Sequence, residues 1–243
     1  LDFVQRCDQH WNLNLTWVEA VTHHGALVGS THKTVDFETA SRSGQPFEEV
    51  ISKYGITNKS YPHCNRELKL NPIFSFKRSL GFKSNHPTAV GYRIDEIDRI
   101  GVKSKETNLV HPLITMVPTT KEEVRHWWLD QPFDLEVPEH LGNCTTCWKK
   151  SDRKLMTLAI DEPWRFEFMR RMEREHRHTG HNAIKEQRVF FREHKTVDNL
   201  FEKAKKPFRK FTDETTLSEI VRSTDLLKSS NIDHLSLSLD KSK

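Results

Sequence analysis

The sequence predicts an α/β protein with a parallel sheet and a helical C-terminal part. In the N-terminal half, stretches of β-forming residues alternate with stretches of helical periodicity, and such alternation favours a parallel sheet. Charged residues directly follow the short apolar stretch at 88–92, and ligands bind at the carboxyl ends of strands in open sheets. The length of 243 residues suits one domain with an appendage.

The chain begins with an expected helix. Residues 1–7 read like the interior of an amphipathic helix rather than a signal peptide, and the first residue is Leu1. We therefore expect a piece whose start is missing. Residues 13–21 are rich in β-formers and predict a strand, and a further extended piece is expected at 34–37. The glycines between these stretches indicate a loop.

Two helices are expected next. Pro46 sits where a helix begins, and apolar residues recur at helical spacing until Gly55. A second helix is predicted for 65–80, kinked or restarted at Pro72.

Two short strands and a helix complete the expected α/β part. Strands are expected at 88–93 and 110–116. A Thr cap followed by acidic residues opens a helix at 119–123, with Val124, Trp127 and Trp128 turned inward.

The rest of the chain is expected to be helical and polar. Helical periodicity returns at 156–172, and a charge run surrounds Pro207. We expect an α/β domain over 1–150, its helical extension over 151–212, and over 213–243 an exposed helix near 217–227 followed by a flexible tail.

Composition excludes several classes of protein. The chain is 35% hydrophobic and 30% charged, with a mean hydropathy of -0.71, and it has no apolar run of the roughly 20 residues that span a bilayer. A formal charge of +4 is too small for the basic stripe of a dedicated nucleic-acid binder, but it allows a phosphate-bearing partner. Four cysteines are too few for a disulfide scaffold, which favours a reducing, cytoplasmic location.

Cys144 and Cys147 have the short spacing of a metal or redox pair. Two thiolates separated by two residues can hold one metal ion or one corner of an iron–sulfur cluster. Ordinary reduced thiols and a redox dithiol remain open alternatives. Cys64 lies far away in the sequence, and spacing alone does not decide its role.

A group of charged residues forms a candidate anion site. Arg93, Glu96 and Arg99 step by three, so they share a face of a helical turn. Arginine matches phosphate and sulfate oxygens well, although a solvated ion-pair network is the alternative. Arg42 lies in a segment that suits either a turn or a phosphate contact. The helix after Cys64 adds further charges to the group: Arg66, Glu67 and Lys69.

The histidines are weaker candidates for metal ligands. Neighbours in an extended chain point to opposite sides, so His23, His24 and the nearby His32 are not expected to share an ion. A second group follows Glu175 on a helix end that is expected to be exposed, where a surface position is favoured over zinc binding: His176, His178 and His181.

Four runs of sequence occur in an order that resembles a known family. They are PHCNRELKLNP at 62–72, VGYRIDEIDR at 90–99, HPLI followed by TKEEVRHWW within 111–128, and GNCTTCWKKS at 142–151. Together they resemble the phosphoadenosine-phosphosulfate (PAPS) reductase-like proteins, in particular the versions common in phages and mobile elements. The resemblance covers residues 1–212.

The resemblance implies an adenine nucleotide alpha-hydrolase-like fold of the ATP-pyrophosphatase superfamily, here without its first strand and its Ser-Gly-Gly-type phosphate loop. Relatives perform sulfonucleotide reduction, thiolation or adenylation. By motif, Arg93 and Arg99 would contact ATP or a PAPS-like nucleotide, with help from Lys69. The resemblance also implies ligands for a 4Fe–4S cluster: Cys64, Cys144 and Cys147, with Cys7 as a fourth.

No cysteine follows Cys147, so the reductases' C-terminal catalytic cysteine motif is not evident. We expect this piece alone to be inactive. The first hypothesis is an enzyme of nucleotide-dependent sulfur or adenylate transfer in the cytoplasm of a bacterium or phage-infected cell, with a sulfur-donor protein and a nucleic acid substrate as candidate partners. The alternative is a binding module for nucleic acid or protein in which the three cysteines and His63 hold structural zinc.

Overall fold

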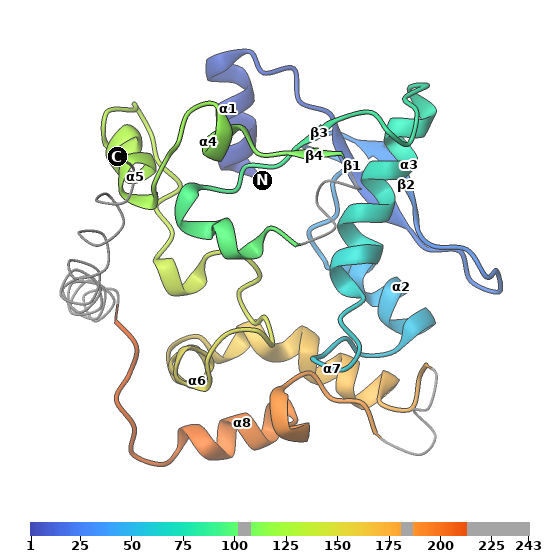
Figure 1. Cartoon of the computed structure of the whole chain (residues 1–243). Helices are drawn as coiled ribbons and strands as arrows, with labels where there is room; N and C mark the ends of the chain where they lie inside the picture. Colours follow the sequence, from blue (N-terminus) through green and yellow to red (C-terminus); the bar gives the residue numbers. More distant parts are fainter. Residues whose placement is uncertain (102–107, 181–186, 213–243) are drawn as a thin grey trace, which may run out of the picture. The chain divides into compact units, whose positions relative to one another are not determined.

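The structure is a computed structural model that describes residues 1–101, 108–180 and 187–212 (Figure 1). The described residues form two compact units. The N-terminal unit comprises 1–57, 61–101, 108–136 and 178–180, and the C-terminal unit comprises 58–60, 137–177 and 187–212. The helix expected near 217–227 and the tail lie outside the described residues, and the domain boundary expected at 150 stays a prediction.

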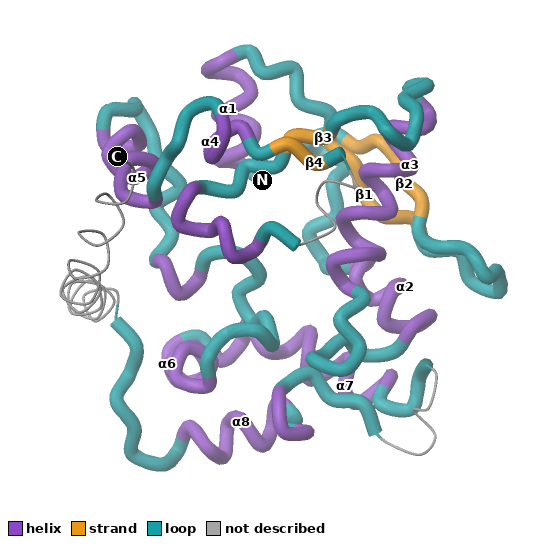
Figure 2. Tube along the Cα trace, viewed as in Figure 1, coloured by secondary structure: helices purple, strands orange, loops and turns teal. Residues whose placement is uncertain are grey.

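The N-terminal unit mixes helices with short strands (Figure 2). Its elements, in chain order, are α1 (Asp2–Trp11), β1 (Trp17–Val21), β2 (Thr31–Val35), α2 (Gln45–Tyr54), the π-helical turn η1 (Arg66–Leu70), α3 (Asn71–Ser79), β3 (Thr88–Ala89), η2 (Ile94–Arg99), β4 (Leu109–Val110), α4 (Pro112–Thr115) and α5 (Lys121–Leu129).

The strands form two small sheets among the described residues. β1 and β2 are antiparallel, with Trp17 opposite Val35 and Val21 opposite Thr31. The sequence predicted a parallel sheet, and this pair departs from it because a loop joins the two strands, whereas a parallel pair needs a longer crossover. β3 and β4 are parallel, with Thr88 opposite Leu109. The mixed α/β class is therefore confirmed, but the described residues are mostly helical.

Three strands are shorter than predicted: β1 begins at Trp17 rather than at residue 13, and β3 and β4 have two residues each. β3 ends at Ala89, and the amide of Tyr92 donates to the carbonyl of Val90 at 2.9 Å, so the chain turns there. The stretch expected as a strand at 110–116 becomes helix α4, with Pro112 in its first turn. Proline cannot donate a hydrogen bond to a strand ladder, but it fits the first turn of a helix.

The helices agree better with the sequence. α2 has proline in its first turn and ends at Gly55, whose φ of 84° is a left-handed value that glycine adopts readily. α5 begins with a capping box, in which Thr120 and Glu123 satisfy each other's backbone amides. On α5, however, Trp127 is 48% exposed rather than turned inward, although its ring lies 5.4 Å from that of Trp11.

The helix predicted for 65–80 is continuous but changes its winding. In η1, the amide of Asn71 donates to the carbonyl of Arg66, five residues back. α3 then continues with ordinary α-helical geometry, and Pro72 lies in its first turn. The restart expected at Pro72 thus takes the form of a π-helical turn, which inserts one residue into the helix.

The C-terminal unit is helical. Its elements are η4 (Glu139–Leu141), α6 (Asp152–Asp161), η5 (Pro163–Phe166), α7 (Glu167–His176), η6 (Arg192–His194) and α8 (Val197–Ala204). The helix predicted for 156–172 is interrupted where Pro163 begins η5. The side chains of Phe166, Met172, Phe190 and Leu200 are fully buried and form its core.

Candidate functional site

Glu67 is the buried centre of the 62–72 motif. Its side chain is 1% exposed and accepts hydrogen bonds from the backbone amide and hydroxyl of Ser30, both at 2.9 Å. Asn71 Nδ2 donates to it at 3.2 Å and Arg66 Nε at 2.7 Å. Burial acts to raise the pKa of Glu67, but the hydrogen bonds from Ser30 and Arg66 outweigh it and hold the pKa below the usual range. The carboxylate therefore fastens the start of β2 to η1.

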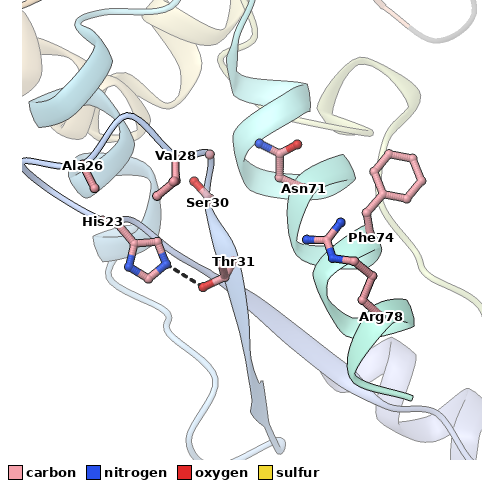
Figure 3. Close-up of a pocket in the computed structure, with 9 residues that line it drawn as sticks. His23, Ala26, Val28, Ser30, Thr31, Asn71, Phe74 and Arg78 are labelled. Carbon is pink, nitrogen blue, oxygen red and sulfur yellow. Dashed lines mark hydrogen bonds between the residues drawn. The ribbon is translucent and has the colours of Figure 1, made fainter. Parts of the chain in front are cut away.

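A cavity of about 550 Å³ lies beside this fastening, within the N-terminal unit. One wall is the loop between β1 and β2 with the start of β2, and the other is α3. In Figure 3 the side chains of Asn71 and Arg78 extend from α3 towards Ser30 and Thr31, whereas the ring of Phe74 turns the other way. The remaining lining residues come from the loop: His23, Ala26, Val28 and Gly29.

The loop wall is held in place by α2. Lys53 Nζ donates to the carbonyls of His23 at 2.7 Å and Val28 at 2.8 Å, and the Tyr54 hydroxyl donates to Val28 at 3.2 Å. His23 Nε2 and Thr31 Oγ1 are 2.7 Å apart and join the two ends of the loop (Figure 3). A wall fixed from both sides gives the cavity its shape before any ligand binds.

The sequence did not predict this cavity, although it contained one signal. Asn71 and Arg78 are seven residues apart on the predicted helix at 65–80, so two helical turns place both polar side chains on one face. Which segment faces them depends on the tertiary fold.

The predicted anion site contains ion pairs. Arg93 contacts Asp95 at 3.0 Å and Glu96 at 3.3 Å, and Arg99 contacts Glu96 at 2.5 Å. The hydrogen bond to Asp95 raises the pKa of Arg93, and the same bond lowers the pKa of Asp95. The spacing of three thus places Arg93, Glu96 and Arg99 together, and with Asp95 the two positive and two negative charges balance. A role in nucleotide binding stays a prediction.

The other predicted nucleotide contacts have different surroundings. Arg42 donates to the carbonyls of Phe37 at 2.7 Å and Ala40 at 3.2 Å, so it closes its own turn. Arg66 pairs with Glu67, and Lys69 is exposed.

Cys144 and Cys147 lie on one hydrogen-bonded turn of the C-terminal unit. The amide of Cys147 donates to the carbonyl of Cys144 at 3.1 Å, and the amide of Lys150 donates to the carbonyl of Cys147 at 2.9 Å. The Lys150 ammonium folds back onto the carbonyls of His140 and Gly142, the latter at 3.0 Å. Burial lowers the pKa of Lys150, while the two nearby cysteines act in the opposite direction. A cation therefore lies near both sulfurs.

The remaining predicted ligands belong to the N-terminal unit. Cys64 and Cys7 are half-buried free thiols, Cys7 on α1. Because they and the Cys144–Cys147 turn belong to different units, a joint centre stays a prediction. His63 Nε2 lies 3.0 Å from the carbonyl oxygen of Gly55.

The predicted histidine groups have mixed surroundings. His24 is exposed, and His32 Nδ1 contacts the Ser75 hydroxyl at 2.8 Å. His176 is half-buried and His178 is exposed, whereas His181 lies outside the described residues.

Comparison with known proteins shows that the chain is similar to a phage protein. It is 32% identical over 163 residues to the "Uncharacterized nin region protein ORF290" of Escherichia phage lambda. The aligned part is 66% of this chain and 55% of the phage protein, so the chain spans about half the length of that relative. No family model matches the sequence. No solved structure matches it either. In the described part of the chain, every helix is too short or too polar to cross a membrane.

Proposed function

We propose that this phage-related chain is part of a PAPS reductase-like enzyme that carries out nucleotide-dependent sulfur or adenylate transfer in the cytoplasm of the host cell. A 4Fe–4S cluster bound by cysteine thiolates would hold or pass the sulfur. The proposal includes the adenine nucleotide alpha-hydrolase-like fold, an ATP or PAPS-like nucleotide, a sulfur-donor protein and a nucleic acid substrate. The observation that carries it is the Cys144–Cys147 turn.

The turn fits a cluster because of its geometry. Cys144 and Cys147 lie on one tight turn closed by a backbone hydrogen bond, and two thiols at this spacing can bind one iron–sulfur cluster. The two sulfurs supply half of the four ligands that such a cluster needs. In this proposal Cys64 and Cys7 supply the others.

The nucleotide would bind at the arginines of η2. Glu96 holds Arg93 and Arg99 at one carboxylate, so the two guanidinium groups are already ordered. Arg99 keeps 61% of its side chain exposed, and a guanidinium has five N–H donors, so donors remain for phosphate oxygens. In the proposal Lys69, Arg66 and Arg42 assist at the edge of the site.

Anaerobic purification tests the metal centre. We expect brown protein with broad visible absorbance and bound iron and sulfide. Cys144→Ser, Cys147→Ser and Cys64→Ser should each lose this absorbance, while Thr145→Ser in the same turn should keep it. Colourless protein with stoichiometric zinc would instead favour the alternative, a zinc-stabilised binding module. Protein without bound metal contradicts both.

Equilibrium binding of ATP and of PAPS tests the nucleotide site. Arg99→Gln should weaken binding by about tenfold, as expected for the loss of one charged contact. Arg125→Gln removes the same charge from an exposed position on α5 and should have no effect. Equal affinities for the two variants would refute the assignment of Arg99.

A further inference from the structure

We propose that the cavity between the β1–β2 loop and α3 binds a small organic oxyanion, a phosphate monoester or a carboxylate, with Arg78 as its anchoring cation. The proposal goes beyond the function proposed above. It uses none of the residues assigned there to the metal centre or to the nucleotide, so either proposal can fail alone.

Arg78 is the first reason. Its side chain lines the cavity, and among the described residues it forms no hydrogen bond or ion pair. In contrast, Arg66, Arg93 and Arg99 each pair with a carboxylate. A guanidinium binds the planar edge of a carboxylate or phosphate through two parallel N–H groups. Arg78 thus has the donors for an oxyanion and no acidic partner among the residues described.

The surrounding charge also favours an anion. The Lys53 ammonium lies behind the loop wall, bound to two neutral carbonyl groups. The carboxylate of Glu67, which contacts Ser30 in the cavity wall, is paired with Arg66. Lys53 and Arg78 therefore leave a positive balance around the cavity, which attracts anions.

The polar groups of the loop wall can complete the recognition. The Thr31 hydroxyl and the His23 ring lie side by side at the cavity, and the Asn71 amide lies on α3 opposite the loop (Figure 3). Lys53, Tyr54 and Glu67 fix the loop from outside the cavity, so a ligand need not order it. Such preorganisation reduces the entropic cost of binding.

The size and the apolar lining argue for an organic anion rather than a bare ion. A volume of about 550 Å³ lies within the range of small-molecule sites, roughly 300–1,000 Å³. Ala26 and Val28 contribute apolar surface to the lining. A ligand with one charged end and a short apolar body would use both parts of the cavity.

Ligand-detected NMR titration of the full chain tests the proposal. The probes are phenyl phosphate and benzoate, which carry the two kinds of oxyanion on the same ring. Two half-probes serve as controls: inorganic phosphate, which lacks the ring, and benzyl alcohol, which lacks the oxyanion. We expect phenyl phosphate or benzoate to bind at least about tenfold more tightly than either half-probe. The tighter of these two probes identifies the oxyanion.

Three variants assign the binding to Arg78. Arg78→Gln should weaken binding of the preferred probe at least about tenfold. Arg78→Lys should bind the probe with intermediate affinity, because lysine restores the positive charge but not the two parallel N–H groups of the guanidinium. Arg125→Gln, a charge-matched change on exposed α5, should leave it unchanged. Binding that is equal in Arg78→Gln and the wild type, or absent for all four probes, overturns the proposal. Inorganic phosphate binding as tightly as phenyl phosphate overturns the organic part.

Discussion

Replacing Glu67 with alanine should destabilise the N-terminal unit strongly. The carboxylate is buried and accepts two hydrogen bonds from Ser30, which is itself only 4% exposed. The alanine variant leaves the amide and the hydroxyl of the buried Ser30 without their carboxylate acceptor. A cavity is also left where the side chain was.

The magnitude follows from these two donors. A buried group that loses its hydrogen-bond partner costs about 1–3 kcal/mol, so the two donors of Ser30 together cost roughly 2–6 kcal/mol. Arg66 is mostly exposed and can be rehydrated, so its ion pair adds little. The alanine variant also no longer has the free-energy cost of burying the charged carboxylate, and this gain offsets part of the loss. The expected destabilisation is about 2–4 kcal/mol. Glu67→Gln keeps one acceptor oxygen and should lose about 1–2 kcal/mol.

Urea unfolding followed by circular dichroism measures these differences. Glu38→Gln, a change to an exposed side chain, is the control and should stay within about 0.5 kcal/mol of the wild type. A loss below about 1 kcal/mol for Glu67→Ala would show that the Ser30 donors find other partners, and it would refute the reasoning.

The pH dependence of stability gives an independent check. Because the pKa of Glu67 is lowered in the folded protein, its contribution is present above the unfolded pKa of about 4.3 and is lost as the pH falls through the folded value. The stability difference between the wild type and Glu67→Gln should therefore shrink in acid. A constant difference across this range would contradict the lowered pKa.

Three further predictions concern other parts of the chain. Asp152 contacts Lys195 at 2.6 Å and Lys203 at 2.5 Å, so Asp152→Asn should cost about 1 kcal/mol in thermal unfolding, and less at high salt. Thr120→Ala removes the cap of α5 and should cost about 1 kcal/mol by urea unfolding; no loss would argue against the capping box. Lys150→Met keeps the aliphatic stem but removes the ammonium that donates to the carbonyls of His140 and Gly142. A chelator should therefore remove bound metal faster from this variant than from the control Lys149→Met. Equal rates would show that Lys150 has no role in holding the turn.

Features set by neighbouring residues in the sequence were the most predictable. The start of α2 at Pro46, its end at Gly55 and the start of α5 at Thr120 follow from local backbone chemistry. Strand length and pairing were not predictable in this way. Whether residues 88–93 or 110–116 extend as strands depends on the segment beside them. The predicted sheet was parallel, but the pair of β1 and β2 is antiparallel.

The candidate sites show the same distinction. A spacing of three predicted that Arg93, Glu96 and Arg99 lie together, and the ion-pair alternative describes their contacts. The oxyanion cavity was missed because Ser30 and Arg78 are far apart in the sequence and meet through the tertiary fold. The joint thiol centre stays a prediction, because Cys7 and Cys64 belong to one unit and the Cys144–Cys147 turn belongs to the other.

The π-helical turn η1 determines how the side chains of α3 are rotated about the helix axis relative to Glu67. Ordinary α-helical winding through the same residues, with no change of length, would rotate every later residue by about 100° about the helix axis, the angle of one residue. Glu67 could keep its place while Asn71 and Arg78 swung away from the β1–β2 loop. The extra residue of the π-helical turn therefore allows Glu67 to hold Ser30 while Asn71 and Arg78 line the cavity from the same helix.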